Sequence, residues 1–297
     1  MNADTPLVLV SNRGPATFDD GHVSRGGGGL VTALQGLVHH RDAVWVASAM
    51  TEGDIAASEE HDGDSFEVEL DGDTYRIKLV ASDPEAYEGF YNVMANPMLW
   101  FIQHYLWDLS NAPDIRRHEV DAYENGYCVV NEDLARAVLD EVGDSEAVVM
   151  LHDYHLYLAP KFIRRERRDL FLHHFIHIPW TQPDAWRVLP ADMREDIYEG
   201  ILANDIIAFH TRSYRRNFLH CCRDLFDLEV DDEAGIVRFE GRDVWVRSYP
   251  LPISAETFHK TAQRPAVHQY EREIIRRRRE HLILRVDRAD LSKNVLR

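Results

Sequence analysis

The chain alternates short apolar runs with longer amphipathic stretches. Five of the apolar runs have the length and composition of buried strands. They are Leu7–Ser11, Val44–Ala49, Ala147–Leu151, Leu170–Ile176 and Asp205–Phe209. Helical spacing marks stretches between them, including Leu30–His39 and Val120–Val142. Strands that alternate with helices predict an α/β fold with a parallel, doubly wound sheet.

Two further segments alternate polar and apolar residues, which is typical of hairpins. Ser65–Ser82 alternates around Asp71-Gly72-Asp73 and predicts a β-hairpin insertion. Leu228–Ser248 predicts a second hairpin that turns near Asp232–Gly235. Between the hairpins, Asp83–Leu109 is rich in aromatic residues and has helical spacing.

The proline-rich segment Pro250–Pro252 ends this pattern. A charged stretch, Ser254–His281, follows and is helical at its end, where REIIRRRRE predicts a solvated or salt-bridged helix face. An apolar run from Ile283 then predicts a new buried strand. We therefore expect three parts: an N-terminal Rossmann-like domain at 1–250, a linker and helix at 251–281, and the first strand and loop of a second Rossmann-like domain at 282–297.

Composition narrows the class of protein. The chain has 297 residues, and no apolar run approaches the ~20 residues that span a bilayer. Its formal net charge of -18 argues against nucleic acid or an anionic membrane as a partner, since both bind basic surfaces. Cys128, Cys221 and Cys222 form neither a disulfide framework nor a CxxC metal motif. The first strand begins without a preceding basic region, so we expect a cytoplasmic protein without a signal peptide.

Arg13 follows the first predicted strand, and a glycine-rich stretch at Arg25–Gly29 then opens a helix. Glycines let backbone N–H groups approach an anion, and a helix N-terminus adds partial positive charge. Because Arg13 adds a full charge, the pattern favours contact with a phosphate or a sugar over a simple hinge. The spacing differs from the GxGxxG of dinucleotide-binding proteins, and no cofactor is predicted.

Two polar residues follow neighbouring predicted strands. Asp153 lies in HDYHL, the segment that follows AVVML, and His177 directly follows FLHHFI. The carboxyl ends of parallel strands form the ligand-binding edge of such sheets, so we expect Asp153 and His177 to lie together there. The alternative for Asp153 is to cap the helix that follows. Nearby histidines lack an accompanying cysteine or acidic cluster, so the sequence predicts no metal site.

Aromatic and cationic residues suggest further contacts. Tyr91 and Trp100 are nine positions apart and would lie on opposite faces of one α-helix. Pro97 is expected to break that helix, which leaves room for both rings in one cleft, although core packing is an equal alternative. Arg288 and Lys293, on the loop after the Ile283 run, are suited to gripping a diphosphate.

Taken in order over residues 7–297, the motifs VSNR, the glycine loop, FYN…LW, HDYHL, FIHIPW, RVLP and VDRADLSKN resemble those of the trehalose-6-phosphate synthases, retaining glycosyltransferases of family 20. The resemblance implies a GT-B fold, in which two Rossmann-like domains face each other across a cleft. It also implies transfer of glucose from a nucleoside diphosphate glucose to glucose 6-phosphate, with neither a cofactor nor a divalent metal.

For the acceptor, the resemblance places Arg13, Tyr91, Trp100 and Asp153 at positions that hold glucose 6-phosphate. Asp153 and His177 match the residues that contact the two sugars at the reacting centre, and His177 is also expected to contact the donor.

For the donor, the resemblance places Gly28 and Gly29 in the loop that approaches the diphosphate. It matches Arg288 and Lys293 to the pair that neutralises this diphosphate, so both are expected to act in catalysis.

The chain departs from the family pattern in two respects. Ser48 stands where the family usually has a tryptophan in the acceptor site, so a glucosylglycerol-phosphate synthase or a cyclitol pseudo-glycosyltransferase stays open. The family's C-terminal domain is missing after Arg297, which keeps a non-catalytic sugar-phosphate-binding module open as well. An interface normally covered by that domain would favour association, including homo-oligomers.

Overall fold

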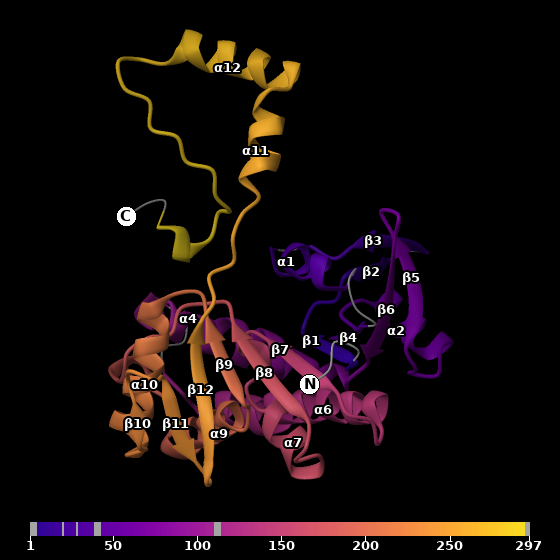
Figure 1. Cartoon of the computed structure of the whole chain (residues 1–297), viewed down its shortest axis with the longest axis vertical. Helices are drawn as coiled ribbons and strands as arrows, with labels where there is room; N and C mark the ends of the chain where they lie inside the picture. Colours follow the sequence, from indigo (N-terminus) through magenta and orange to yellow (C-terminus); the bar gives the residue numbers. More distant parts are fainter. Residues whose placement is uncertain (1–4, 20, 28, 39–42, 110–113, 295–297) are drawn as a thin grey trace. The chain divides into compact units, whose positions relative to one another are not determined.

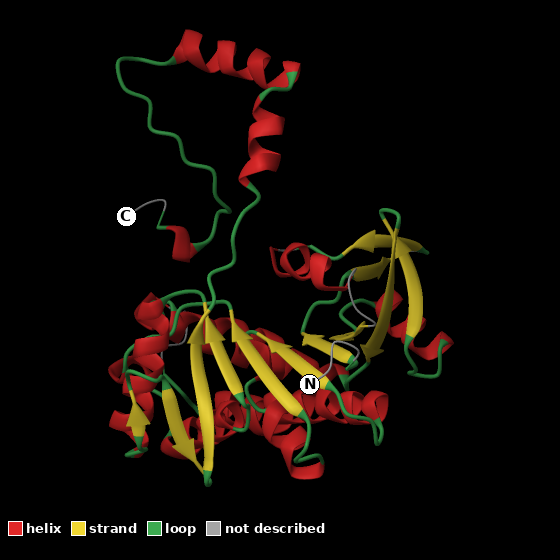
Figure 2. Ribbon diagram, in the orientation of Figure 1, coloured by secondary structure: helices red, strands yellow, loops and turns green. Residues whose placement is uncertain are grey.

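The computed structural model describes residues 5–19, 21–27, 29–38, 43–109 and 114–294. The chain divides into two compact units, Met1–Tyr249 and Pro250–Arg297. In the first unit, ten strands of the described residues form one sheet in the order β10-β11-β12-β9-β8-β7-β1-β4-β6-β5 (Figures 1 and 2). They are β1 (Leu7–Ser11), β4 (Ala43–Ser48), β5 (Phe66–Leu70), β6 (Asp73–Val80), β7 (Val148–His152), β8 (Phe171–Ile176), β9 (Ile206–Phe209), β10 (Val230–Asp231), β11 (Ile236–Phe239) and β12 (Arg242–Ser248).

Helices connect most of these strands. They are α1 (Gly29–Val38), α2 (Glu52–Glu60), α3 (Pro84–Glu88), the π-helix η1 (Gly89–Trp100), α4 (Phe101–Gln103), the short η2 (Trp107–Leu109), α5 (Arg117–Ala122), η3 (Tyr123–Tyr127), α6 (Cys128–Val142), η4 (Tyr154–Leu156), α7 (Ala159–Glu166), α8 (Pro183–Trp186), α9 (Ala191–Leu202) and α10 (Arg212–Phe226).

The strands from β12 through β6 pair in parallel, and antiparallel strands lie only outside them. This arrangement confirms the predicted α/β fold class with a mainly parallel sheet. The hairpin expected within Ser65–Ser82 is also confirmed, as β5 paired with β6.

The segment Leu228–Ser248 forms three strands, so the prediction of one hairpin was incomplete. A turn does lie between β10 and β11, where Asp231 pairs with Ile236. A tighter reversal joins β11 to β12 at Glu240 and Gly241, whose φ angles are 49° and 73°. Two successive residues with positive φ match the twist of a two-residue hairpin, which is why the main reversal occurs there. The hairpin of β2 (Ala16–Asp19) and β3 (His22–Arg25) was not predicted.

Both faces of the sheet are buried around β1. Val8 and Val10 join a large apolar cluster that includes residues of η1, α6, α7, α9 and α10. Leu7 and Leu9 alternate with them and join a second cluster with residues of α1 and α2. Burying such a side chain contributes about 1.5–3 kcal/mol. The uninterrupted apolar character of β1 follows from this cover on both faces.

Pro97 does not break the aromatic-rich helix, contrary to expectation. Helix α3, the π-helix η1 and α4 run on from Pro84 to Gln103 with Pro97 inside η1. The bonds of a π-helix run from i to i+5, and this wider turn relieves the clash of the proline ring with the preceding turn. Since two π-turns take about nine residues, Tyr91 and Trp100 lie on the same side of the helix.

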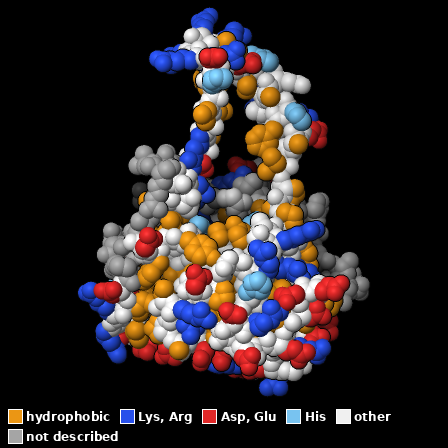
Figure 3. Space-filling model, turned by 90° about the vertical axis from the view of Figure 1, so that its left-hand side faces the viewer, with side chains coloured by type: hydrophobic (Ala, Val, Ile, Leu, Met, Phe, Trp, Pro, Cys, Tyr) orange, Lys and Arg blue, Asp and Glu red, His pale blue; other side chains and the backbone are white. Residues whose placement is uncertain are grey.

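The second unit contains α11 (Ala255–Ala262), α12 (Pro265–Arg277) and the short η5 (Leu291–Lys293). The strand expected from Ile283 is not formed, and Leu282, Ile283, Leu284 and Val286 are exposed. A strand needs a neighbour to satisfy its N–H and C=O groups, and no described segment pairs with this one. The space-filling view shows apolar and basic side chains along this unit (Figure 3).

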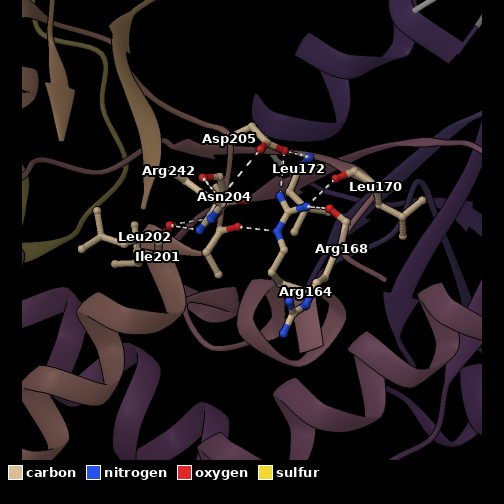
Figure 4. Close-up of polar contacts among 10 residues, drawn as sticks. Arg164, Arg168, Leu170, Leu172, Ile201, Leu202, Asn204, Asp205 and Arg242 are labelled. Carbon is tan, nitrogen blue, oxygen red and sulfur yellow. Dashed lines mark hydrogen bonds and ion pairs between the residues drawn. The ribbon is translucent and has the colours of Figure 1, made fainter. Parts of the chain in front are cut away.

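A polar cluster closes the amino ends of β8, β9 and β12 (Figure 4). Arg164, on α7, donates to Oδ2 of Asp205 at 2.7 Å and to the carbonyls of Arg168, Leu170 and Ala203. The same Oδ2 accepts the N–H of Leu172 at 2.8 Å. One carboxylate therefore holds α7 against the starts of two strands.

We expect Asp205→Ala to lower the free energy of unfolding by about 2–3 kcal/mol, because it leaves the Arg164 guanidinium and a backbone N–H without their acceptor. Urea unfolding measures the change. The control Glu132→Ala removes the carboxylate of an exposed pair with Arg136 and should cost less than about 1 kcal/mol. Equal losses in the two variants would show that the cluster adds nothing beyond an ordinary surface pair.

Candidate active site at the carboxyl edge of the sheet

Asp153 and His177 lie together at the carboxyl edge, as predicted. Strands β7 and β8 are parallel neighbours, with His152 opposite Phe175. The N–H of Asp153 donates to the Phe175 carbonyl at 2.8 Å, and Oδ1 of Asp153 accepts the N–H of His177 at 3.2 Å. The Asp153 carboxylate makes no capping bond to the helix that follows, so the alternative structural role is not observed.

The backbone at Asp153 is strained. Its φ and ψ are 70° and 177°, in a region that glycine alone adopts readily. Such a conformation costs about 1–3 kcal/mol and tends to persist at functional sites. The tertiary contacts on both sides of Asp153 hold the carboxylate at the sheet edge in spite of this cost.

Burial shifts the pKa values of Asp153 and His177 toward their uncharged forms. It raises the pKa of Asp153 from its ordinary value of 3.8 to about 7. Burial also lowers the pKa of His177 to about 3, with a further contribution from His210. The His177 Nε2 lies 3.2 Å from Nδ1 of His152, whose pKa is likewise lowered by burial. Near neutral pH the imidazoles are uncharged, and the cluster can donate and accept hydrogen bonds as sugar hydroxyls require.

His210 also belongs to this edge, although sequence reasoning gave it no role. It directly follows β9, and its ring centroid lies 5.2 Å from that of His177 in an edge-on arrangement. It also packs against Phe175 at 5.0 Å. The rule that singled out Asp153 and His177, a polar residue directly after an apolar strand, applies equally to His210 and could have found it.

A second group of side chains lies near Arg13. The Tyr91 ring stacks on His155 with centroids 5.9 Å apart and on Tyr87 at 5.8 Å. Burial lowers the pKa of His155 to about 3, and the positive charge of Arg13 lowers it further. The Tyr87 hydroxyl donates to Asn12 Oδ1 at 3.2 Å. The exposed Arg13 therefore lies close enough to Tyr87 of α3 and to His155 to act on their pKa values.

The loop after β7 connects the two groups. Tyr154 directly follows Asp153, and its hydroxyl donates to Asn96 Oδ1 on η1 at 2.7 Å. Trp100, further along η1, is half-buried and packs against His104, with ring centroids 4.2 Å apart. The structure thus brings Arg13, Tyr91 and the loop of Asp153 to one region, whereas Trp100 packs against His104 and the large apolar cluster.

The glycine loop has a structural requirement of its own. A Cβ on Gly26 would lie 2.1 Å from the Gly14 carbonyl oxygen, so only glycine fits there. Gly27 lies against the Arg13 guanidinium, since an added Cβ would be 4.0 Å from Nη1. Gly29 begins α1, which has no acidic residue in its first turn. Gly28 lies outside the described residues.

Ser48 ends β4 at the same edge of the sheet. Its side chain is buried, and its hydroxyl has no hydrogen-bond partner within the part of the chain that the structure describes. Its N–H donates to the Asn12 carbonyl at 3.2 Å, beside Arg13. A small, unpartnered hydroxyl thus stands where a ring was expected from the family pattern.

Arg288 and Lys293 belong to the second unit. The Arg288 guanidinium is exposed and lies 3.4 Å from the Asp290 carboxylate. A hydrogen bond from Ser292 lowers the pKa of Asp290, and the charges of Lys293 and Arg288 lower it further. The two cations therefore flank one carboxylate on the same loop.

No group of three or more His, Cys, Asp or Glu side chains among the described residues is arranged to hold a metal ion. No helix in the same part of the chain is both long and apolar enough to cross a bilayer.

The chain belongs to Glycosyltransferase family 20, whose sequence profile matches residues 6–297. It is 30% identical to a "Bifunctional trehalose-6-phosphate synthase/phosphatase" of Thermoproteus tenax over 98% of this chain and 39% of that protein. It is 31% identical to a "Validamine 7-phosphate valienyltransferase" of Streptomyces hygroscopicus subsp. jinggangensis over 84% of this chain and 52% of that protein.

The solved structures that resemble the chain have the same fold. One, described as "Trehalose-6-phosphate from E. coli bound with UDP-2-fluoro glucose", has a TM-score of 0.70 at 23% identity and matches 91% of this chain and 55% of that one. A "Trehalose-6-phosphate synthase" structure has a TM-score of 0.71 at 25% identity and the same coverage. The chain thus spans about half the length of the relatives it matches.

The raised pKa of Asp153 predicts an inverted pH dependence of stability. Between about pH 4 and pH 7 the folded state holds a proton on Asp153 that the unfolded state has released, so stability falls as pH rises through this window. Asp153→Asn removes this loss. We expect its stability relative to the unaltered protein to rise by about 2–3 kcal/mol from about pH 5 to pH 8.

Urea unfolding at several pH values measures this difference, in which the contributions of the histidines cancel. Asp169→Asn serves as the control, because Arg167 lowers the pKa of Asp169 to about 2 and its titration ends below the window. If the stability of Asp153→Asn relative to the unaltered protein does not change with pH, the folded state does not hold the additional proton on Asp153. Carboxyl-carbon NMR should place the Asp153 midpoint near pH 7 directly.

Proposed function

We propose that this chain is the acceptor-binding part of a retaining glucosyltransferase that transfers glucose from a nucleoside diphosphate glucose to glucose 6-phosphate, giving trehalose 6-phosphate. One observation supports this most: the cation of Arg13 and the buried Asp153–His177 pair both follow strands at the carboxyl edge of one parallel sheet. A phosphate pairs with a cation such as Arg13, and sugar hydroxyls form hydrogen bonds with side chains such as those of Asp153 and His177.

Each acceptor residue contacts the part of glucose 6-phosphate that suits its side chain. Arg13 binds the phosphate of glucose 6-phosphate through its guanidinium fork. Tyr91, held by its stacking on His155, lines the sugar with an aromatic face, and Trp100 extends the same side of η1. Asp153 and His177 hydrogen-bond hydroxyls where the two sugars meet. Because Asp153 and His177 directly follow paired strands, their side chains can position the acceptor oxygen before reaction.

The donor half of the reaction involves the glycine loop and the second unit. Gly28 and Gly29 let the backbone approach the diphosphate, and Arg288 and Lys293 neutralise its charge as it departs. The bond from the glucose C1 to the diphosphate oxygen breaks while the acceptor oxygen bonds to C1 on the same face. The leaving phosphate oxygen takes the acceptor proton, so no protein nucleophile and no divalent metal is required. The reaction is expected in the cytoplasm, without nucleic acid or membrane partners.

A second acceptor class is favoured by a specific observation. The relative from Streptomyces hygroscopicus, 31% identical, is a validamine 7-phosphate valienyltransferase, which marks a cyclitol phosphate as an alternative acceptor. Ser48 brings a small hydroxyl to the acceptor side of the sheet in place of a ring. The alternative of another class is a sugar-phosphate-binding module without catalysis, which would bind the acceptor and form no product.

Glucose 6-phosphate should bind this chain, and Arg13→Gln should raise the dissociation constant about tenfold by removing the charged contact to phosphate. Isothermal titration calorimetry measures both, with Arg136→Gln, a surface arginine on α6, as the charge-matched control. Comparing glucose 6-phosphate with glycerol 3-phosphate and validamine 7-phosphate orders the acceptors. If both variants lose binding to the same extent, Arg13 makes no specific contact with the acceptor phosphate.

Incubation with glucose 6-phosphate and UDP-, GDP- and ADP-glucose then tests transfer, with mass spectrometry as the readout. A product at the mass of trehalose 6-phosphate supports the transferase. Acceptor binding without any product supports the non-catalytic module for the chain as it stands.

A further inference from the structure

The edge of the sheet opposite the candidate active site carries a cationic pocket. It has a volume of about 470 Å³ and lies where α7, the end of α9 and the turn between β11 and β12 meet. Five basic residues line it: Lys161, Arg164, Arg165, Arg168 and Arg242. In a chain of net charge -18, this is a local concentration of positive charge.

Two of the arginines, Arg164 and Arg242, are held in place by hydrogen bonds, and their two positive charges face a single carboxylate. Arg164 and Arg242 share one carboxylate, Asp205, at 2.7 Å and 3.8 Å (Figure 4). Arg242 also donates to the Leu202 carbonyl at 2.9 Å. Burial lowers the pKa of Arg242, and the charge of Arg164 lowers it further. Two guanidinium groups set against one carboxylate leave an excess charge that a bound anion would offset.

The other arginines are available for a ligand. Arg165 and Arg168 are exposed, and among the described residues neither forms an ion pair with a carboxylate. Arg165 lies over the Phe162 ring at 5.6 Å, which orients its side chain without using its charge. Lys161 differs, because its ammonium is paired with Asp196.

Two acidic residues, Glu199 and Glu240, also line the pocket and oppose its charge. Neither is ion-paired within the described part of the chain. These two carboxylates limit the affinity of the pocket for an anion. Removing one of them should strengthen the binding of an anion and weaken the binding of a cation, so such a variant tests the sign of the ligand's charge.

We propose that this pocket binds a small phosphate-bearing anion, either inorganic phosphate or a phosphate monoester, through Arg165 and Arg168 with Arg242 at its base. Guanidinium forks match phosphate oxygens, and the volume suits a small metabolite. The pocket lies at the amino ends of β9 and β12, whereas Asp153 and His177 follow carboxyl ends. At about 3.3 Å per residue the strands separate the two regions by roughly 15–20 Å, so one ligand cannot occupy both.

Phosphate titration followed by amide NMR tests the pocket in the whole chain at constant ionic strength. Inorganic phosphate should shift the amides of Asn204 and Gly241, which border the pocket. Arg165→Gln/Arg168→Gln should raise the phosphate dissociation constant from these shifts about tenfold. The control Arg117→Gln/Arg136→Gln changes the net charge equally, on exposed arginines elsewhere, and should alter it by less than about twofold.

Glu240→Gln provides the second arm and should lower the phosphate dissociation constant severalfold, since it removes an opposing charge. The proposal is overturned if both double variants bind phosphate equally, or if Glu240→Gln weakens binding. Repeating the titration with glucose 6-phosphate distinguishes the source of the anion: saturation of the same amides at lower concentration identifies a phosphate monoester, and tighter binding of inorganic phosphate identifies the free ion. Arg13→Gln should leave these shifts unchanged, which separates this pocket from the proposed acceptor site.

Discussion

The parallel pairing of β7 with β8 is the constraint on which the candidate site depends. It places Asp153 beside His177 and links them through the backbone of one strand and the carboxylate on the other. A shift of register would reverse the faces of the apolar residues on β8 and move His177 away from the edge. The strained backbone of Asp153 is tolerated because this pairing fixes it from both sides.

Buried imidazoles are uncharged at the candidate site, whereas the surface carries many charged side chains. At the carboxyl edge, burial keeps the imidazoles of His152, His155 and His177 neutral and holds a proton on Asp153 up to about pH 7. Elsewhere, acidic and basic side chains are interspersed over the face in Figure 3. In the acceptor site that we propose, Arg13 would supply the cation, and hydrogen bonds to hydroxyls would separate a sugar phosphate from a simple anion.

Much of the site was predictable from local pattern. Buried parallel strands are encoded as apolar runs, and the residues that follow them lie at one edge, so the sequence alone locates Asp153 and His177 there. The same rule covers His210, which shows that the rule was applied too narrowly. Pro97 was misjudged because a π-helix accommodates a proline that an α-helix would not, and the sequence carries no simple signal for that wider turn.

The fold class, the main strands and the residues at their ends follow from local sequence, because hydrophobic periodicity and turn chemistry act over a few neighbouring positions. Which distant residues meet depends on how the whole chain packs. Arg13 lies near His155, and Asp205 joins Arg164 to Arg242, through sheet order and helix packing that no local pattern encodes. The run from Ile283 shows the same limit from the other side: its residues have the composition of a strand, yet a strand forms only where a neighbour supplies its hydrogen bonds.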